Sequence, residues 1–575
     1  MRRFAPFLAL LAAVLLVYAP ALRDGWVWDD TALVLRDPLI RSPFLLTEGF
    51  RHFLFLDATA SDFYRPLQRA VYTLDYALAG FTPWVFHLTS LLVHAGAALA
   101  LYAFGRRLLA WPGVSANPGR FCLPAFAAAL VWAIHPIHTS AVVYVSGLAD
   151  PLAALCGLGG LALLMGGRRI AAGLCLGAAL FAKESGAFAV VLGLAAAGIL
   201  ARREGKPLAA FARVAVPALA LAVLYLGLRV SAERTPPPPP APLPLAARAE
   251  CGLRAVAEYG GLLAAPRTLR MERNVRTSPW GGWQTLAGAV LLGAGVCWCL
   301  SARPAGRACL LAAGAAYLPV SNLLALNATV AEHWVYVPSA FLFLAAADGL
   351  SRRRLPDRRF AIGAAALAGA WLAALGVRTT VRCGDWRDQE TFLRATLRDG
   401  GRSSRMLGNL ALLALGRGDT GEAVRGFREA LALEPNQPFA RLGLGNALLE
   451  HGDFAEARAC LEDCAKNPLL RSLALVRLAE LDRREMGRDP VERLREAAQA
   501  APRFWPARKQ YIARLLQRRD AEPALHELRA VLAQAPYRAE TWGMLSRALE
   551  QIGRPDLARA AAAQAALRDV WWGKN

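Results

Sequence analysis

The stretch FAPFLALLAAVLLVYAPAL, residues 4–22, is apolar throughout and is followed at once by RDGWVWDD, residues 23–30. A helix of about 20 apolar residues is long enough to cross the roughly 30 Å hydrocarbon core of a bilayer. The alternative is a signal peptide, with the two arginines at its start and APA, residues 19–21, as a cleavage site. The run exceeds the usual apolar core of a signal peptide, about 7–15 residues, which favours a retained helix. In both cases the chain after residue 23 lies outside the cytoplasm.

The rest of the N-terminal two thirds repeats this pattern of apolar runs. The 575 residues are 55% hydrophobic, which predicts a polytopic membrane protein. Segments between alternate runs are rich in arginine and hold two acidic residues, Glu204 and Asp357, so the positive-inside rule places them in the cytoplasm. This asymmetry accounts for much of the net charge of +22, and we expect no nucleic-acid partner. We expect about eleven spans, at residues 4–22, 85–104, 121–139, 150–167, 170–183, 186–201, 209–228, 284–301, 308–326, 334–350 and 360–377.

The C-terminal third carries a periodic signal of another kind. Prolines recur at intervals of 33 to 34 residues, which is the tetratricopeptide period, at Pro435, Pro468, Pro502 and Pro536. The pattern predicts a helical solenoid of about five repeats near residues 403–570. Such arrays present a groove suited to an extended peptide. The alternative is that the repeats only hold a complex together.

The acidic pair after the first run raises a question about chemistry. Trp26 and Trp28 are typical of the membrane–water interface, and they would hold Asp29 and Asp30 at the level of lipid head groups. The alternative is that one of the two acids caps the following run TALVL as a helix N-cap.

Other polar residues also gather in the predicted outer segments. Residues 170–201 are too few for two full crossings, so the Lys183–Glu184 pair at the hairpin tip is expected below the outer surface, as a functional pair or a structural salt bridge. His135 and His138, three residues apart, are a possible metal pair or packing residues at a helix end. No CxxC pair occurs, which argues against zinc and thioredoxin chemistry.

Five motifs occur in a fixed order ahead of the repeats: WDDTALVLRDPLI, YRPLQRAVYTLDYALAGFTPWVFHLTSLLVHAG, HPIHTSAVVYVSGLADPLAAL, FAKESG and AEHWVYVPS. In this order the chain resembles the transmembrane-and-tetratricopeptide family of protein O-mannosyltransferases and its bacterial relatives. The resemblance implies a GT-C glycosyltransferase that uses a polyprenyl-phosphate sugar and inverts the anomeric carbon. It also implies that Asp29 and Asp30 form the catalytic motif.

The chemistry agrees with this implication. Phosphate leaves without a strong general acid, so one carboxylate base suffices. Cations must balance the charge that develops on the phosphate, and the nearby candidates are Arg65, Lys183, His135 and His138. Four residues of the same motifs are further site candidates: Asp150, Glu184, Glu332 and His333. The sequence departs from the family pattern at three positions, where Ser140 replaces an acid and Leu148 and His333 replace arginines.

The sequence therefore predicts an all-α protein with a GT-C-like membrane domain at 1–378, a linker at 379–402 and a tetratricopeptide domain at 403–575. We expect an enzyme that transfers a mannose-like sugar to an exported protein or glycan acceptor. It would lie in a bacterial inner membrane with its motif loops and repeats on the periplasmic side. Its partners would be a polyprenyl-phosphate sugar, membrane lipid and an extended protein acceptor in the repeat groove. We assign no metal ligands and leave a divalent metal ion open as a cofactor. The alternative function is a non-catalytic, membrane-anchored scaffold on a degenerate GT-C body.

Overall fold

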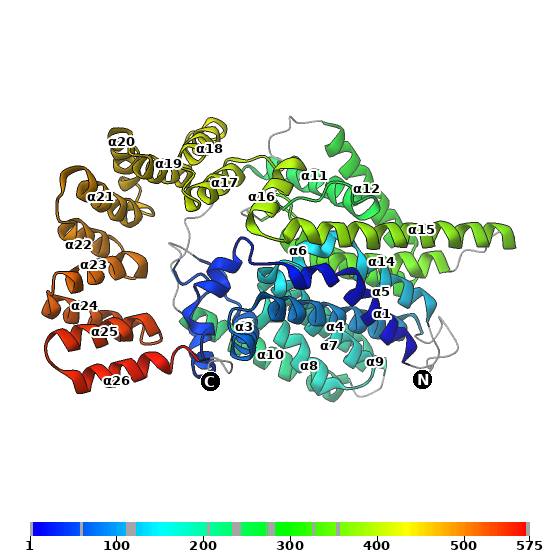
Figure 1. Ribbon diagram of the computed structural model, residues 1–575. Coiled ribbons are helices and arrows are strands. Elements are labelled where there is room, and N and C mark those ends of the chain that lie inside the picture. The colour runs from blue at the N-terminus through cyan, green and yellow to red at the C-terminus, as the bar shows by residue number, and fades with distance from the viewer. Residues whose placement is uncertain are drawn as a thin grey trace.

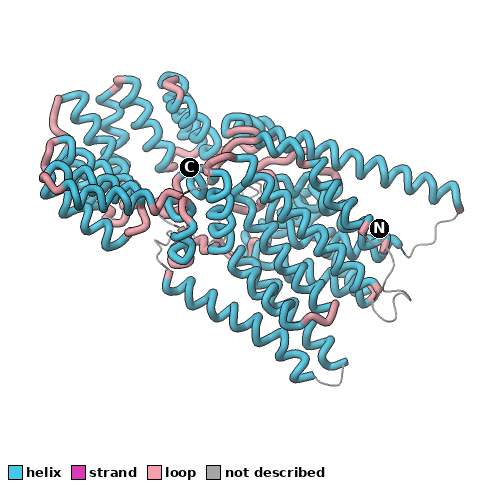
Figure 2. The backbone as a smooth tube through the Cα atoms, turned by 60° about the horizontal axis from the view of Figure 1, so that its bottom comes forward, coloured by secondary structure: helices cyan, strands magenta, loops and turns pink. Residues whose placement is uncertain are grey.

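A computed structural model describes residues 4–57, 61–110, 122–203, 207–232, 243–271, 273, 282–324, 328–351 and 357–570. Within these ranges the protein is all-α, and its only bridge of the β type with both partners described joins Arg273 and Val330. The helices form a membrane bundle, coloured blue to green in Figure 1, and an arc of helix pairs, coloured yellow to red. Figure 2 shows the same two parts without strands. The predicted fold class is confirmed.

Each of the eleven predicted spans overlaps a helix of the bundle. These helices are α1 (Ala5–Val17), α4 (Pro83–Leu109), α5 (Leu123–Ile134), α7 (Ala149–Met165), α8 (Arg169–Ala182), α9 (Ala187–Arg203), α10 (Pro207–Ser231), α12 (Trp283–Ser301), α13 (Pro304–Tyr317), α14 (Tyr336–Ser351) and α15 (Arg358–Cys383). In the described residues seven helical segments are long and apolar enough to cross a membrane, and an eighth is bent by 50° between Leu123–Ile134 and Pro136–Val142. The chain is an integral membrane protein.

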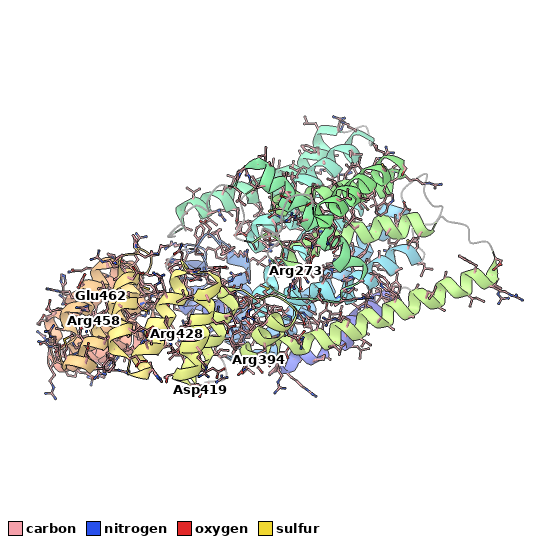
Figure 3. All side chains as sticks on the ribbon, turned by 90° about the horizontal axis from the view of Figure 1, so that it is seen from above. Arg273, Arg394, Asp419, Arg428, Arg458 and Glu462 are labelled. Atoms are coloured by element: carbon pink, nitrogen blue, oxygen red, sulfur yellow. The ribbon has the colours of Figure 1, made fainter. Side chains whose placement is uncertain are left out.

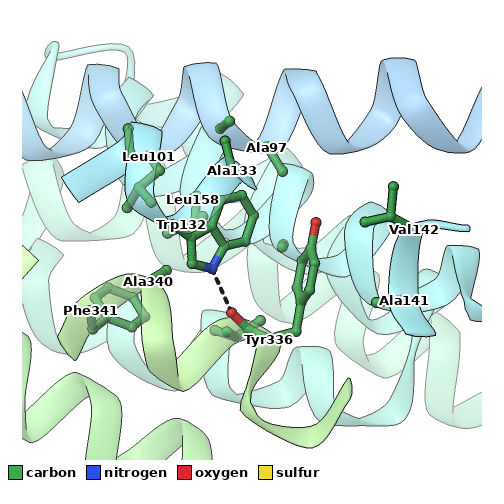
Figure 4. Packing of buried hydrophobic residues seen from close by; sticks show 14 of the residues in the cluster. Ala97, Leu101, Trp132, Ala133, Ala141, Val142, Leu158, Tyr336, Ala340 and Phe341 are labelled. Atoms are coloured by element: carbon green, nitrogen blue, oxygen red, sulfur yellow. Dashed lines mark hydrogen bonds between the residues drawn. The ribbon is translucent and has the colours of Figure 1, made fainter. Parts of the chain in front are cut away.

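Small residues let the bundle helices approach closely. A Cβ atom at Gly173 of α8 would lie 2.4 Å from the carbonyl oxygen of Val214 in α10, so no larger residue fits there. Larger side chains fill the centre, where Trp132 of α5 donates a hydrogen bond of 2.8 Å to the carbonyl oxygen of Tyr336 (Figure 4). Leu101 of α4 and Phe341 of α14 are buried around this bond.

Short elements connect the spans. Between α1 and α4 lie η1 (Ala19–Arg23), η2 (Thr31–Leu35), η3 (Pro38–Ile40), η4 (Pro43–Leu45), α2 (Leu46–Gly49) and α3 (Pro66–Ala79). Farther along the chain are η5 (Pro136–His138), α6 (Thr139–Val142), η6 (Val145–Leu148), η7 (Glu184–Gly186), α11 (Leu245–Ala264), η8 (Leu318–Val320) and η9 (Glu332–Val335). After α15 come η10 (Gly384–Trp386) and α16 (Gln389–Arg398).

One arginine organises the first outer segment, residues 23–65. Arg69 of α3 is 2% exposed, and its Nε donates a hydrogen bond of 2.9 Å to Asp37. The other guanidinium nitrogens donate to the carbonyl oxygens of Gly49, His52 and Phe53 at 2.8 to 2.9 Å. A buried charge is tolerated when it is paired and fully hydrogen-bonded, and here it fixes a segment that has little regular structure.

The arc consists of five antiparallel helix pairs. They are α17 (Ser404–Gly416) with α18 (Thr420–Leu433), α19 (Pro438–His451) with α20 (Phe454–Ala465), α21 (Arg471–Met486) with α22 (Val491–Ala500), α23 (Trp505–Gln517) with α24 (Ala521–Gln534), and α25 (Ala539–Gln551) with α26 (Pro555–Ala566). Small and large residues alternate in the core of each pair, as Ala423 and Phe427 do in α18. Arginines join successive repeats on the surface: Arg428 pairs with Glu456 at 2.8 Å and Arg458 with Glu485 at 2.6 Å. Figure 3 labels Arg428 and Arg458 on the arc.

The arc returns to the membrane domain at its far end. Val570 donates its backbone N–H to the carbonyl oxygen of Arg41 at 2.8 Å, and Ser42 donates to the carbonyl oxygen of Leu567 at 2.9 Å. The hydroxyl of Tyr76 in α3 donates to Asp569 at 2.6 Å. Figure 1 shows α26 ending close to α3. The solenoid therefore leaves the bundle at α16 and contacts it again at α26.

Candidate active site

Asp30 is buried and fully hydrogen-bonded. Its Oδ1 accepts from both the backbone N–H and the hydroxyl of Ser146, at 2.8 and 2.6 Å, and its Oδ2 accepts from the backbone N–H of Val27 at 3.0 Å. Burial raises the pKa of Asp30 to about 7, although the hydrogen bonds from Ser146 and Val27 lower it in part. Asp30 makes no side-chain cap to the helical turn Thr31–Leu35, so the capping alternative is wrong for this residue. Its carboxyl group ties the first outer segment to η6.

Asp29 has a different environment from its neighbour. It is half-buried, and its backbone N–H donates to the hydroxyl of Tyr144 at 3.1 Å. Burial raises the pKa of Asp29, and the Tyr144 hydroxyl, Arg405 and Arg65 each lower it. Because Asp29 is less buried than Asp30 and lies near cations, its carboxylate is the one of the pair that a ligand can approach.

Trp28, directly before the acidic pair, has a strained backbone. Its φ angle is +55°, in the left-handed region that costs a residue other than glycine about 1–3 kcal/mol. The side chain of Gln389 accepts the Trp28 backbone N–H, the ring of Phe392 lies 5.6 Å from the indole, and the guanidinium of Arg405 lies 5.5 Å from it. Trp26 packs on Phe86 at 5.1 Å. Contacts within the protein therefore fix the side chains of both tryptophans, and their level relative to lipid head groups stays a prediction.

A row of aromatic rings connects these contacts. Tyr144 stacks on Trp386, and the ring of Trp386 lies 4.8 Å from that of Phe392. The ring of Phe392 in turn contacts that of Trp28. The hydrogen bond from Asp29 to Tyr144 closes the row into a ring. Trp386 and Phe392 belong to segment 379–402, which we predicted as a linker, yet both are buried in the main core. This segment forms one wall of the site.

The cations of the site are paired with acids. Lys183 donates to both carboxylate oxygens of Asp150, at 2.6 and 2.8 Å. Arg65 donates to Glu184 at 3.2 Å, and Arg229 lies 3.7 Å from the same carboxylate. The predicted Lys183–Glu184 ion pair is therefore wrong. Lys183 has an extended backbone at the end of α8, so its side chain and that of Glu184 point in different directions.

His333 and Glu332 are adjacent but belong to different groups. His333 interacts electrostatically with Lys183, Asp150 and Arg65. Glu332 is 1% exposed and accepts the backbone N–H of Arg270 at 2.6 Å. A second arginine, Arg382, lies 3.7 Å from its other oxygen. His333 thus belongs to the Lys183 group, whereas Glu332 contacts Arg270 and Arg382.

His135 and His138 lie in a packed environment. His135 accepts the backbone N–H of Ile137 at 3.2 Å, and its other ring nitrogen lies 3.1 Å from the carbonyl oxygen of Leu263. The ring of His138 lies 5.2 Å from Trp132 and 4.9 Å from Tyr336. The partners of these histidines differ from those of Arg65 and Lys183. Among the described residues, no group of three or more His, Cys, Asp or Glu side chains is suited to holding a metal ion.

Two of the departures from the family pattern lie in the packed interior. Leu148 is fully buried in an apolar cluster with Leu33 and Tyr72. The hydroxyl of Ser140 is buried and makes no hydrogen bond within the described part of the chain.

Sequence reasoning missed several residues that shape the site. Tyr144 and Ser146 lie within the motif HPIHTSAVVYVSGLADPLAAL, between its histidines and Asp150. Trp386, Gln389 and Phe392 lie in a segment whose composition indicated only a connection. An aromatic residue directly after the last span was the available signal.

Comparisons with known proteins agree with the motifs. A tetratricopeptide-repeat family profile matches residues 414–466. Over 154 residues the chain is 32% identical to the protein O-mannosyl-transferase TMTC1 of Mus musculus, covering 26% of this chain and 15% of that protein. It is 29% identical over 188 residues to TMTC2 of Homo sapiens, covering 30% and 21%. The match to the protein O-mannosyl-transferase F38B6.6 of Caenorhabditis elegans is 27% over 167 residues, covering 28% and 23%. The chain thus matches less than a quarter of the length of each of these relatives.

Among solved structures, the chain is similar to ArnT from Cupriavidus metallidurans bound to undecaprenyl phosphate, with a TM-score of 0.36, 16% identity and 81% of each chain covered. It is also similar to the tetratricopeptide protein YrrB, with a TM-score of 0.21, 19% identity, and 30% and 90% covered. The sequence comparisons show that the chain is similar, over about a quarter to a third of its length, to proteins named protein O-mannosyl-transferases and that it carries tetratricopeptide repeats.

Proposed function

We propose that this protein is a membrane glycosyltransferase that transfers a sugar, mannose or a similar hexose, from a polyprenyl phosphate to a hydroxyl group of an exported protein, with inversion at the anomeric carbon. The observation that carries the proposal is the pair Asp29 and Asp30, of which Asp30 is locked by Ser146 while Asp29 stays half-buried beside cations. The names of the sequence relatives support the same class of reaction.

Asp29 is the general base of the proposed reaction. The acceptor hydroxyl gives its proton to Asp29 as its oxygen bonds to the anomeric carbon, and the bond from that carbon to the phosphate oxygen breaks. A base works best when its pKa approaches the working pH, and burial moves the pKa of Asp29 in that direction. Asp30 acts through its neighbour, because its hydrogen bonds fix the backbone that carries Asp29.

Lys183 and Arg65 are proposed to bind the departing phosphate. Arg65 interacts electrostatically with both Asp29 and Lys183, and His333 lies in the same electrostatic group. Each cation has an acid partner, Asp150 or Glu184, which holds its side chain in place before the donor arrives. Preorganised charges of this kind stabilise negative charge as it develops in the transition state.

The site is proposed to face the periplasm of a bacterial inner membrane. The excess of arginine in the opposite loops supports this orientation. It places the solenoid on the same side as Asp29, where the repeats would bind an extended acceptor protein.

A second candidate is a scaffold without enzymatic activity. The observation in its favour is that Lys183 and Arg65 are already neutralised by Asp150 and Glu184, and that Leu148 is part of an apolar core. Such a protein would use its repeats to hold partners at the membrane.

Sugar transfer from a labelled polyprenyl-phosphate hexose, measured in lipid nanodiscs, separates the two candidates. Asp29→Asn keeps the size of the side chain but removes its basicity, and should lower kcat by about 10²–10⁴-fold while donor binding persists. Asp62→Asn, in the same outer segment but on an exposed residue, is the matched control and should retain activity. Equal rates for wild type and Asp29→Asn would refute the assignment of the base, and no transfer by any form would favour the scaffold.

A further inference from the structure

A cavity of about 400 Å³ lies between the solenoid and the first outer segment. One wall is formed by residues 52–56 and Ser61. The other wall is formed by the turns that connect successive repeats and by the helix ends beside them, and it includes Pro468 and Pro502 of the proline series. Membrane-spanning helices contribute none of the lining residues, so the cavity lies between two parts of the protein outside the bundle.

The lining of this cavity is basic. Arg503, Arg508 and Arg538 belong to it, and none of the described lining residues is acidic. Arg538 already holds a carboxylate, because Asp57 from the first outer segment accepts its guanidinium at 2.5 Å. Arg508 pairs with Glu527 at 3.2 Å. Arg503 is exposed and has no ion-pair partner among the described residues, so its charge is available to a ligand.

Aromatic side chains surround these charges. Phe53 and Phe55 come from the outer segment, and Phe504, Trp505 and Tyr537 come from the repeats. The guanidinium of Arg538 lies 5.6 Å from the ring of Trp505 and 5.7 Å from that of Tyr537. Aromatic faces with fixed arginines suit a peptide that carries both carboxylate and apolar side chains.

The wall formed by residues 52–56 continues toward the proposed active site. Leu54 donates its backbone N–H to the carbonyl oxygen of Phe63 at 2.8 Å, two residues before Arg65. Phe55, with φ at +61°, holds a strained turn within this wall. A ligand in the cavity would therefore contact the same short segment that carries a proposed phosphate-binding arginine.

We infer that this cavity binds an acidic segment of the protein acceptor, with a carboxylate at Arg503 and apolar side chains on Phe504 and Trp505. This inference rests on the proposed function. It places the binding site for the acceptor at the edge formed by the inter-repeat turns and not in the general groove of the repeats. A lipid head group is less suitable because the lining comes from the repeats and the outer segment alone.

The test measures peptide binding in the absence of any sugar donor, so it does not depend on catalysis. Full-length protein in nanodiscs of neutral lipid is titrated into a fluorescein-labelled peptide, Gly-Asp-Tyr-Asp-Ser-Gly, and fluorescence anisotropy is recorded. The matched peptide has asparagine in place of both aspartates. We expect the acidic peptide to bind more tightly and Arg503→Gln to weaken it by about fivefold, the factor that corresponds to about 1 kcal/mol.

Two variants control for charge and folding. Arg503→Glu should abolish binding of the acidic peptide, whereas Arg529→Glu should not, because Arg529 is an exposed arginine of α24 outside the cavity. Equal affinity for the two peptides, or equal losses in the two charge-reversal variants, would overturn the inference. Binding of glycerol 3-phosphate, measured directly by calorimetry, without measurable peptide binding would also overturn it, in favour of a lipid head-group site. Failure of sugar transfer alone leaves these binding results unchanged.

Discussion

The indole of Trp386 stacks on the phenol of Tyr144, with ring centroids 5.3 Å apart and planes inclined by 29°. Tyr144 follows the bent helix of the bundle, whereas Trp386 follows the last span, 242 residues farther along the chain. The hydroxyl of the same tyrosine accepts the backbone N–H of Asp29. The beginning of the C-terminal third therefore helps to position the proposed base, and this dependence can be measured.

Gln389 links the C-terminal third to the backbone next to Asp29 through its hydrogen bond with Trp28. Gln389→Ala removes the acceptor for the Trp28 backbone N–H, so the strained backbone at Trp28 should relax and displace Asp29. We expect kcat to fall by up to about 10²-fold, the effect of a shift of about 1 Å in a reacting group, with little change in donor KM. Gln389→Glu keeps an acceptor oxygen and should rescue most of the rate. If the alanine variant is as active as wild type, Gln389 has no positioning role.

The pH dependence of kcat/KM tests Asp29 as base. Because burial raises the pKa of Asp29, the rate should fall as pH drops through a value above the ordinary 3.8 of aspartate. Tyr144 lowers this pKa through its hydroxyl, so Tyr144→Phe should move the acid limb of the profile to higher pH. An acid limb that stays in place in Tyr144→Phe would show that another group controls the profile.

Asp30 should make the free energy of unfolding fall as pH rises, which is opposite to the effect of an aspartate whose pKa is lowered by folding. Its pKa is raised to about 7 in the folded state, so between about pH 4 and 7 only the folded protein keeps this proton. Rising pH therefore removes stabilisation, by up to about 4 kcal/mol over this interval. Asp30→Asn cannot ionise and should show a flatter profile of thermal unfolding in detergent between pH 5 and 8. Parallel profiles for the two proteins would contradict the assignment of this titration to Asp30.

The pair Lys183–Asp150 has a structural part and a proposed functional part, and a double variant separates them. Lys183→Gln alone leaves a mostly buried carboxylate without its partner and should destabilise the protein by about 3–5 kcal/mol. Lys183→Gln combined with Asp150→Asn removes both charges and should recover much of that stability. Donor affinity should stay low in both variants if Lys183 binds phosphate. Recovery of donor affinity in the double variant would limit Lys183 to a structural role.

Membrane orientation can be tested by labelling single cysteines with an impermeant thiol reagent in sealed vesicles of known sidedness. In a cysteine-free background, Asp62→Cys and Glu434→Cys should react from the same side, and Ser351→Cys from the other. All three positions are exposed, so differences in burial do not confound the comparison. Reaction of Ser351→Cys together with Glu434→Cys would reverse the proposed assignment of sides.

The parts of the fold with a strong local signal were predictable. Hydropathy located a helix at each predicted span, although among the described residues only seven helical segments, or eight with the bent one, are long and apolar enough to cross a membrane. The proline period located the repeat array. Both signals depend on residues near one another in sequence. The pairing of Lys183 with Asp150 was not predictable in this way, because its partners lie 33 residues apart on different elements. The same holds for Trp28, whose strained backbone depends on Gln389, 361 residues away. Sequence patterns identified most of the polar residues of the site, but their partners follow from the tertiary fold.

The contacts at both ends of the solenoid limit how this family of sequences can evolve. An array fixed at one end can gain or lose a repeat without affecting the rest of the protein, as repeat proteins commonly do. Here the backbone N–H of Gly25 donates a hydrogen bond to the carbonyl oxygen of Arg387, just before the array begins. At the end of the array, the backbone N–H of Val570 donates to the carbonyl oxygen of Arg41. Deleting or duplicating one helix pair would displace Val570 and Asp569 from Arg41 and Tyr76. We therefore expect sequences that keep both sets of contacts to vary in their repeat side chains but to retain the same number of repeats.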